Sequence, residues 1–329
     1  MLVSKTLRGF QFGLESTASQ GTAVVANRIL KNGTFSNKRQ NNVKKGEAEG
    51  HKSAIGQQRG KRWSEWKLNG QLGYNIPPYV VGLLLSAAAG AAPTSVGTGA
   101  YQYGATMSSQ NSDTPQTLTF EYGNNLGSNS RFAYGTAADL TIKVNESSCD
   151  YDISGFGAYP AKNVTLNTTG VVTIPALLAN MTDFRFNYAS TFAGLSSGKL
   201  LTAKDLEINV KNKYKAVFFI DDATVSIGGI LERRPEITGK VIVAQGTESD
   251  YFLGNLETST MCYMQMQGTG PLIGGGVYNS LKLTFPFFVN NEDETDDSDL
   301  FAGSYDFYAG EDTVNGDFSL SAVCALANL

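Results

Sequence analysis

The sequence contains few of the residue types that enzymes most often use for catalysis. It has a single histidine, His51, and three widely spaced cysteines, Cys149, Cys262 and Cys324. One histidine excludes metal sites built from several histidines. It also argues against a nucleophile–histidine–acid triad, because His51 lies in a polar segment that offers no rigid frame. An odd number of distant cysteines predicts free thiols in a reducing cytoplasm. We expect no catalytic residue, metal or cofactor.

Long hydrophobic runs are also absent. The longest uncharged apolar stretch, Tyr79–Ala92, is too short to cross a bilayer, and the first residues lack the continuous apolar core of a secretory signal. We therefore expect a protein without a membrane segment that is synthesised in a cytoplasm. Glycine runs such as Gly274–Gly276 are not followed by Lys and Ser or Thr, so they do not predict a phosphate-binding loop.

Glycine, aromatic residues and small polar residues are abundant instead. The chain has 36 glycines and 11% aromatic residues, while only 17% of its residues are charged. This composition favours β structure with many turns. A length of 329 residues allows one large domain or two ordinary ones.

Positive charge is concentrated in one segment. Residues 28–67 hold 11 of the 26 Lys and Arg residues but only three of the 30 acidic residues. Residues 31–62 have almost no large apolar side chains and cannot bury enough surface to order themselves. We interpret them as a long basic arm or β-hairpin extension that orders against a partner; a disordered loop is the alternative. The scarcity of aromatic residues and the acidic remainder of the chain argue against nucleic-acid binding by this arm.

Negative charge is concentrated in residues 290–299. Six acidic residues lie there: Glu292, Asp293, Glu294, Asp296, Asp297 and Asp299. They predict a solvated acidic loop, which another subunit could contact. Binding of a divalent cation is the alternative, although the spacing lacks the ligand pattern of an EF-hand. A basic arm and an acidic body are complementary between copies, which permits head-to-tail association.

The stretch Lys61–Gly90 organises the first half of the chain. Trp66, Leu68, Leu72 and Tyr74 alternate with polar residues or glycine, which predicts a strand with one buried face. Two prolines follow and can start a helix, because proline lacks the N–H group that a first helical turn leaves unused. We expect a buried helix over residues 79–89 that ends at Gly90.

A related unit occurs at Arg233–Leu256. Ile237, Gly239, Val241 and Val243 repeat the alternation at a constant offset of 169 residues from Leu68, Gly70, Leu72 and Tyr74. A second helix follows, which Thr247 or Ser249 would cap. We expect the helices to pack on the core through Tyr79, Leu84, Tyr251 and Leu256. The repeat divides the chain into residues 1–175 and 176–329, and only the basic arm has no counterpart in the second part.

Several segments resemble the major tail tube proteins of long-tailed bacteriophages. In Arg59–Gly90, Gly-Lys-Arg precedes a strand that ends Asn-Gly-Gln-Leu, then a proline corner and a helix that begins Tyr-Val-Val-Gly-Leu-Leu. Gly13-Leu-Glu-Ser-Thr followed by Gly21-Thr-Ala-Val is similar, as are Thr114-Pro115 and the strands at Thr117–Phe120 and Leu140–Val144. The resemblance is best over residues 7–155 and looser over 184–326.

This resemblance implies a mainly β chain of two tandem tail-tube β-sandwich or barrel domains, each with a short flanking α-helix. It implies a structural protein of the virion tail that is not an enzyme. Its partners would be other copies of itself, a tape-measure protein and DNA that passes through the lumen without specific binding. Three chains would form a pseudo-hexameric ring, which we favour over six. We expect ring-to-ring contacts at Lys38, Arg39, Lys44, Lys45, Lys52 and Arg59.

Two alternatives remain at this point. A tail terminator or a baseplate tube ring would use the same fold but form a single ring. A secreted carbohydrate-binding β module belongs to another class. It would need an export signal and an exposed aromatic platform, whereas the tryptophans are only Trp63 and Trp66, and Trp66 lies on the buried side of its predicted strand.

Overall fold

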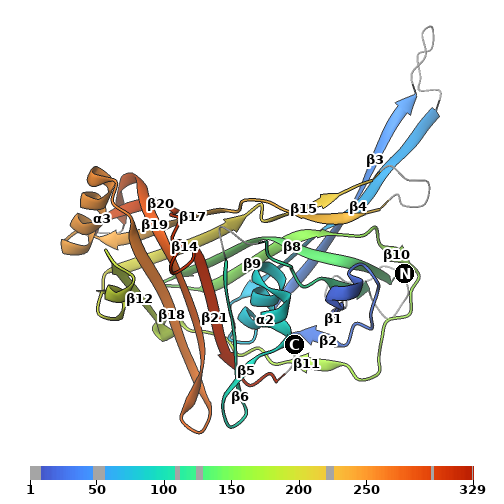
Figure 1. The fold of residues 1–329 in the computed structure, drawn as a ribbon, viewed down its shortest axis with the longest axis horizontal. Helices are drawn as coiled ribbons and strands as arrows, with labels where there is room; N and C mark the ends of the chain where they lie inside the picture. Colours follow the sequence, from blue (N-terminus) through green and yellow to red (C-terminus); the bar gives the residue numbers. More distant parts are fainter. Residues whose placement is uncertain are drawn as a thin grey trace.

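The computed structural model describes residues 9–46, 56–107, 112–123, 129–219, 226–297, 300–327 and 329, with only the backbone for 44–46, 56–59, 295–297 and 300. Strands contain 57% of the chain and helices 13%, which confirms the mainly β fold predicted from the composition. A long hairpin formed by β3 (Thr34–Gly46) and β4 (Gly56–Gln71) leaves the molecule at one end (Figure 1).

The other strands follow in chain order. In the first half they are β1 (Gly9–Leu14), β2 (Arg28–Leu30), β5 (Thr94–Gly97), β6 (Ala100–Met107), β7 (Leu118–Gly123), β8 (Ser130–Asn145), β9 (Cys149–Gly157), β10 (Ala161–Lys162) and β11 (Val172–Ile174). In the second half they are β12 (Phe184–Ala189), β13 (Lys199–Leu200), β14 (Ala203–Lys211), β15 (Tyr214–Val217), β16 (Gly229–Glu232), β17 (Glu236–Ala244), β18 (Cys262–Gly274), β19 (Val277–Asp297), β20 (Leu300–Ala309) and β21 (Phe318–Cys324).

Eight strands form one continuous antiparallel array in the order β3-β4-β9-β8-β14-β17-β20-β19. A single row of directly paired residues crosses the whole array. Its members are Thr34, Asn69, Asp152, Thr141, Asn209, Thr238, Tyr308 and Phe288. The row begins on β3 and ends on β19, so these two strands are the outer strands of the array.

The two faces of the array differ in polarity. None of the eight residues of this row is fully buried, and five of them have polar uncharged side chains. The adjacent row contains Tyr151, Ile142, Ile208, Phe307 and Val289, all of which are buried. The period of two expected for half-buried strands therefore holds across the sheet, with one face on the core and the other open to solvent.

The buried face is covered by shorter strands and by helices. In the first half, β1 pairs with β2 and β7, and β7 pairs with the beginning of β8. In the second half, β18 pairs with β12 and with the first part of β19. The C-terminal β21 pairs with β19 and with β6 of the first half, so it joins the two halves of the covering layer.

The helix after β4 differs in detail from the prediction. Helix α1 (Pro77–Val80) begins at the prolines, continues as a π-helical turn over Val81–Leu85, and stops at Ser86, which has an extended backbone. Helix α2 (Ala87–Ala91) then starts with the Ser86 hydroxyl as its cap. Gly90 therefore lies within α2, and the prediction that it ends the helix is wrong. A Cβ at Gly90 would lie 2.7 Å from the Cα of Gly82, so glycine permits this close approach.

Helix α3 (Thr247–Thr258) follows β17, as the repeat predicts. Its N-terminal flanking residue is Gly246, and no side chain caps it, so the capping roles predicted for Thr247 and Ser249 are wrong. Thr247 is the first helical residue, and the Ser249 hydroxyl lies 2.7 Å from the Tyr305 hydroxyl. The chain also forms 3-10 turns at Thr17–Ser19, Met181–Asp183 and Ala193–Ser196.

One large apolar cluster contains side chains from both halves of the chain. Tyr79 and Leu84, which the sequence predicts to pack on the core, are buried in it. Tyr251 and Leu256 of α3 pack against it while remaining partly exposed. The fully buried residue of α3 is their neighbour Phe252, whose ring lies 5.4 Å from that of Tyr305.

Candidate functional site

The two outer strands of the array each have an unpaired edge. Strand β3 pairs only with β4 among the described residues. At Phe287, β19 has β20 on one side and β18 on the other, but from Phe288 to Asp297 only β20 accompanies it in the described part of the chain. Exposed edges of this kind are templates for pairing with another chain. The edges of β3 and β19 are therefore the first candidate site.

The array consists of two strand sets with the same connectivity. The first strand set is β3, β4, β9 and β8, and the second strand set is β14, β17, β20 and β19. In each set a hairpin is followed by a helix and then by an antiparallel pair whose later strand lies beside the hairpin. The sets also place their glycines alike. A Cβ at Gly70 would lie 2.1 Å from the Asn32 carbonyl oxygen, and one at Gly239 would lie 2.3 Å from that of Glu207.

The two strand sets meet at the internal junction, which is the antiparallel pairing of β8 with β14. Six residue pairs form it, from Leu140 opposite Val210 to Asn145 opposite Asp205. Across it, the Thr141 hydroxyl donates to the Asn209 side chain at 2.6 Å, and the Lys143 ammonium lies 3.1 Å from the Asp205 carboxylate. The junction thus pairs the last strand of one set with the first strand of the next.

The basic arm is a β-hairpin in its described part. Its strands reach Gly46 and resume at Gly56, as the hairpin prediction requires. The predicted contact residues Lys38 and Arg39 lie near its base. Lys44, Lys45 and Arg59 lie farther out along β3 and β4, and their side chains are not described. Lys52 and His51 lie outside the described residues.

The expectation that the arm has no counterpart is wrong. Strands β15 and β16 form a second hairpin between β14 and β17, at the position that the arm occupies between the inner parts of β3 and β4. This hairpin packs on the first half of the chain. The Tyr214 hydroxyl donates to the Leu84 carbonyl oxygen at 3.3 Å, and the rings of Phe218 and Trp63 are 5.5 Å apart. Its sequence differs so much from the Lys-rich arm that composition could not relate the two.

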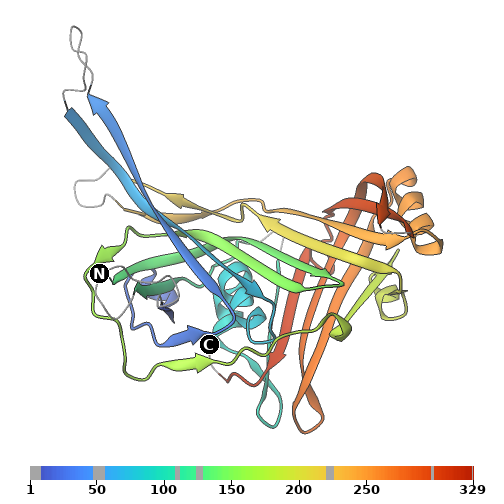
Figure 2. The same cartoon turned by 180° about the vertical axis from the view of Figure 1, so that it is seen from behind.

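The acidic run also has a different structure from the prediction. Residues from Glu292 to Asp297 form the end of β19 and pair with β20, so they are not a loop. Asp299 lies outside the described residues. The pairing places this acidic hairpin, β19–β20, next to α3, at the end of the molecule opposite the arm (Figure 2). The sequence pattern did not predict this strand, because the strand extends beyond the core and needs no alternating apolar residues there.

Beside the base of the arm lies a basic recess of about 570 Å³. It is lined by Asn37, Lys38, Arg39, Tyr122, Ser130, Lys162 and Asn163. The Arg39 guanidinium donates to the Ser130 hydroxyl at 2.9 Å, and the Tyr122 hydroxyl donates to the Asn37 side chain at 3.0 Å. These hydrogen bonds hold the lining in place. Lys162 follows no pattern in the sequence, so only the fold identifies it as part of the recess.

Positive charge is focused around this recess. The Arg62 guanidinium lies over the Tyr159 ring, 3.7 Å from its centre. A hydrogen bond from Arg62 and the charges of Arg62, Arg39 and Lys162 lower the pKa of the Tyr159 hydroxyl. The Arg62 Nε atom is buried without a hydrogen-bond partner among the described residues. The base of the arm therefore favours an anionic partner.

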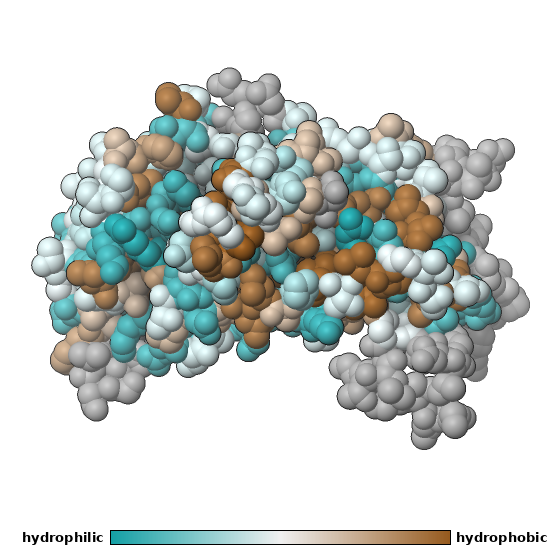
Figure 3. All heavy atoms as spheres, turned by 90° about the horizontal axis from the view of Figure 1, so that it is seen from below, coloured by the Kyte–Doolittle hydropathy of each residue, from teal (hydrophilic) through white to brown (hydrophobic). Residues whose placement is uncertain are grey.

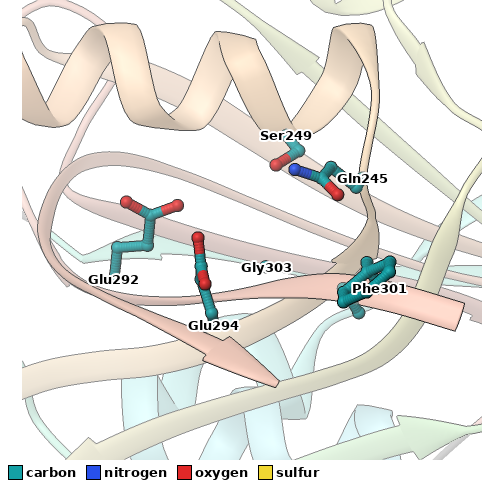
Figure 4. A pocket seen from close by; sticks show the side chains of 7 residues that line it. Gln245, Ser249, Glu292, Glu294, Phe301 and Gly303 are labelled. Atoms are coloured by element: carbon teal, nitrogen blue, oxygen red, sulfur yellow. The ribbon is translucent and has the colours of Figure 1, made fainter. Parts of the chain in front are cut away.

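The acidic hairpin borders a pocket of about 390 Å³ beneath α3. Glu292 and Glu294 extend from one side of β19, toward the pocket that Gln245, Ser249 and Phe301 also line (Figure 4). The Tyr305 hydroxyl donates to Glu292 at 2.9 Å. Burial, together with the hydrogen bond to Glu292, raises the pKa of Tyr305 to about 12. Asp293 and Glu294 are exposed to solvent.

In the described ranges, no three His, Cys, Asp or Glu side chains are placed to hold a metal ion. The three cysteines are buried free thiols. Burial, with the nearby charges of Asp150 and Asp183, raises the pKa of Cys149 to about 11. The described helices are all too short or too polar to span a membrane.

Exposed apolar side chains form a band across the face seen from below (Figure 3). Several large ones lie in the segment around β11 that runs along this side, including Val172, Leu178 and Met181. Exposed apolar surface is common at sites of protein association. By contrast, Trp66 is buried and donates its indole N–H to the Phe156 carbonyl oxygen, so it contributes to no surface platform.

Neither the comparison with protein-family models nor the comparison with curated proteins found a match for this chain.

Proposed function

We propose that this chain is a structural subunit that associates edge to edge into rings, and that the rings stack into the tail tube of a bacteriophage. The resemblance of the sequence to major tail tube proteins supports this proposal. The two unpaired edges of the eight-stranded array are the observation that carries it, because the chain already contains one example of the contact they would form.

The internal junction is the template for the contact between copies. It pairs Thr141, on the last strand of the first strand set, with Asn209 on the first strand of the second. In the row across the sheet, the equivalent end positions are Phe288 and Thr34. We therefore place Phe288 of one copy opposite Thr34 of the next. Such a contact uses different surfaces on the two copies, so it closes into a ring when the rotation permits.

We interpret each strand set with its helix as one tail-tube-like domain, so that a chain supplies two domains. Three chains then supply ~24 strands, which at about 4.8 Å spacing and ~40° tilt close a barrel of roughly 48 Å backbone diameter. Inner side chains reduce the opening to about 35–40 Å. A DNA duplex, whose diameter is about 20 Å, is narrower than this opening and fits within it. Six chains would be required if only the first strand set formed the barrel.

The solvent-facing side of the sheet suits the inner wall of a tube. It carries polar residues such as Thr141 and Asn209, and two of its lysines, Lys67 and Lys143, form ion pairs with Asp152 and Asp205. A wall with few free positive charges would let DNA slide instead of binding it. We propose the tape-measure protein as the occupant of the lumen during assembly and DNA as the occupant during delivery.

Mass measurement and electron microscopy test this proposal. Purified protein should form rings of three times the 35.2 kDa chain mass, and concentrated protein should form stacked rings with a central channel. Rings that never stack, at a few copies per virion, would favour a tail terminator or baseplate ring. A chain that remains monomeric at every concentration would contradict the proposal.

A further inference from the structure

The two ends of the molecule have opposite charge. The arm end carries the basic recess with Lys38, Arg39 and Lys162, and Arg62 lies close by. The opposite end carries the acidic hairpin and the N-terminal part of α3, where Asp293, Glu294 and Asp250 are exposed. The two ends are separated by the length of the sheet, so they cannot meet within one chain (Figures 1 and 2).

Among the described side chains, the basic residues of the recess and the exposed acids Asp293 and Glu294 form no ion pair within their own end. The described ion pairs involve Lys67, Lys143, Lys213 and Arg131, and none of them includes a basic residue of the recess. Glu65, the acidic residue at the base of the arm, already accepts a hydrogen bond from Gln40 at 2.6 Å. At the other end, Asp293 and Glu294 take part in none of these ion pairs. Each end therefore has charge available for a partner.

The shapes of the two ends are also complementary in kind. The acidic hairpin projects because β19 and β20 continue past Asn291 and Asp306, whereas the equivalent strands β8 and β9 turn at Asn145–Cys149. The basic end instead has a recess between β3, β7, β8 and β10. Each chain has one projecting acidic hairpin and one basic recess, so every hairpin can have a recess of another copy as its partner.

We propose that the acidic hairpin of one copy docks in the basic recess of a second copy, and that this contact stacks one ring on the next. This inference rests on the proposed ring-forming function and identifies its axial contact. A phosphate-bearing nucleic acid would satisfy the recess but would leave the acidic hairpin without a partner. A second copy satisfies both, and a contact between unlike ends repeats without limit, as a tube requires.

Charge reversal at each end, separately and together, tests the contact. One variant carries Arg39→Glu and Lys162→Glu, and another carries Asp293→Lys and Glu294→Lys. A matched control reverses Lys240 and Lys282, which are exposed and lie in neither end. Negative-stain microscopy and sedimentation measure rings and tubes at an ionic strength of about 0.1 M, and again at about 1 M, where the Debye length falls from ~10 Å to ~3 Å.

Each double reversal should abolish tubes while leaving single rings, and mixing the two reversed proteins or combining all four changes in one chain should restore tubes. The control should form tubes, and high salt should disperse them into rings. Normal tubes from either reversed protein, or no recovery in the four-residue variant, would overturn the axial contact but not ring formation. Binding of duplex DNA to the recess that competes with stacking would assign the recess to nucleic acid and overturn it too. If the unmodified protein forms no rings, the proposed function itself would be overturned.

Discussion

The buried ammonium of Lys213 forms an ion pair with the carboxylate of Asp113, which lies 100 residues earlier in the chain. Glu232 completes the group, with an oxygen 3.6 Å from the same nitrogen. The Lys213 side chain is fully buried. This ion pair connects the hairpin β15–β16 to the first half of the chain, in addition to the pairing of β8 with β14.

Replacing Lys213 by Met should destabilise the fold strongly. The change would leave Asp113 and Glu232 without a counter-charge, and breaking a buried pair in this way costs about 3–5 kcal/mol. Lys143→Met removes a more exposed cation from the internal junction and should cost about 1 kcal/mol or less. Urea denaturation of both variants measures the difference. Equal stability of the two would refute the role of the buried pair.

Alanine at Gly70 or at Gly239 should disturb the sheet in the same way. A Cβ at Gly70 would lie 2.1 Å from the main-chain oxygen of Asn32, in the turn before β3, and one at Gly239 would lie 2.3 Å from that of Glu207 on β14, so the adjacent backbone must move away. We expect a loss of about 1–3 kcal/mol in unfolding free energy, as for overpacked sites. Gly254 in α3 is the control, because nothing lies near its Cβ position and alanine there should stabilise the helix by about 0.5–1 kcal/mol. A similar effect at all three positions would contradict the close approach.

Cysteines at Thr34 and Phe288 should form a disulfide between copies. The row across the sheet and the internal junction together predict that these residues face one another in a ring. Oxidation of the double variant should yield covalent dimers and trimers on a non-reducing gel. The pair Thr34→Cys with Lys282→Cys is the control, because Lys282 lies where β19 is paired on both sides. Equal cross-linking of the two pairs would exclude the proposed register. The native thiols are buried and should not interfere.

The turn after β20 should make stability depend on pH below about 4. Burial raises the pKa of Asp312, but hydrogen bonds from Asn315, Val314 and Tyr263 outweigh it and lower the value from 3.8 to about 2. A lowered folded-state pKa stabilises the protein above the ordinary value, and this contribution disappears as the pH falls through about 2. Asp312→Ala should cost about 1–3 kcal/mol at pH 7. Its deficit should shrink toward pH 2, whereas Glu311→Gln, an exposed neighbour, should show no such trend in thermal unfolding.

The sequence predicted what depends on alternation. Trp66 and Leu68 identified a strand with one buried face, and Gly239 revealed its counterpart because both strands need the same side-chain period. Pairing between distant strands was beyond such reasoning. The sequence of Leu140–Val144 does not specify β14 as its neighbour, because many apolar strands could form the same main-chain hydrogen bonds with it.

The candidate site was predictable only where charge gathers in sequence. Lys38 and Arg39 stood out within a basic segment, whereas Lys162 is isolated and reaches the recess through the fold. The second hairpin was missed because its contacts are made by Tyr214 and Phe218, which resemble core residues and not the arm. The acidic strand was missed because pairing of main-chain groups imposes no apolar pattern beyond the core.

The internal junction also bears on the kinetics of ring formation. A covalent link holds its two strands together at a high effective concentration, so this pairing does not depend on how much protein is present. In a ring of three chains, half of the contacts between strand sets would already exist in each folded monomer. Only the other half would require collisions between molecules. Dilution would therefore release intact pairs of strand sets and would not separate them into six units.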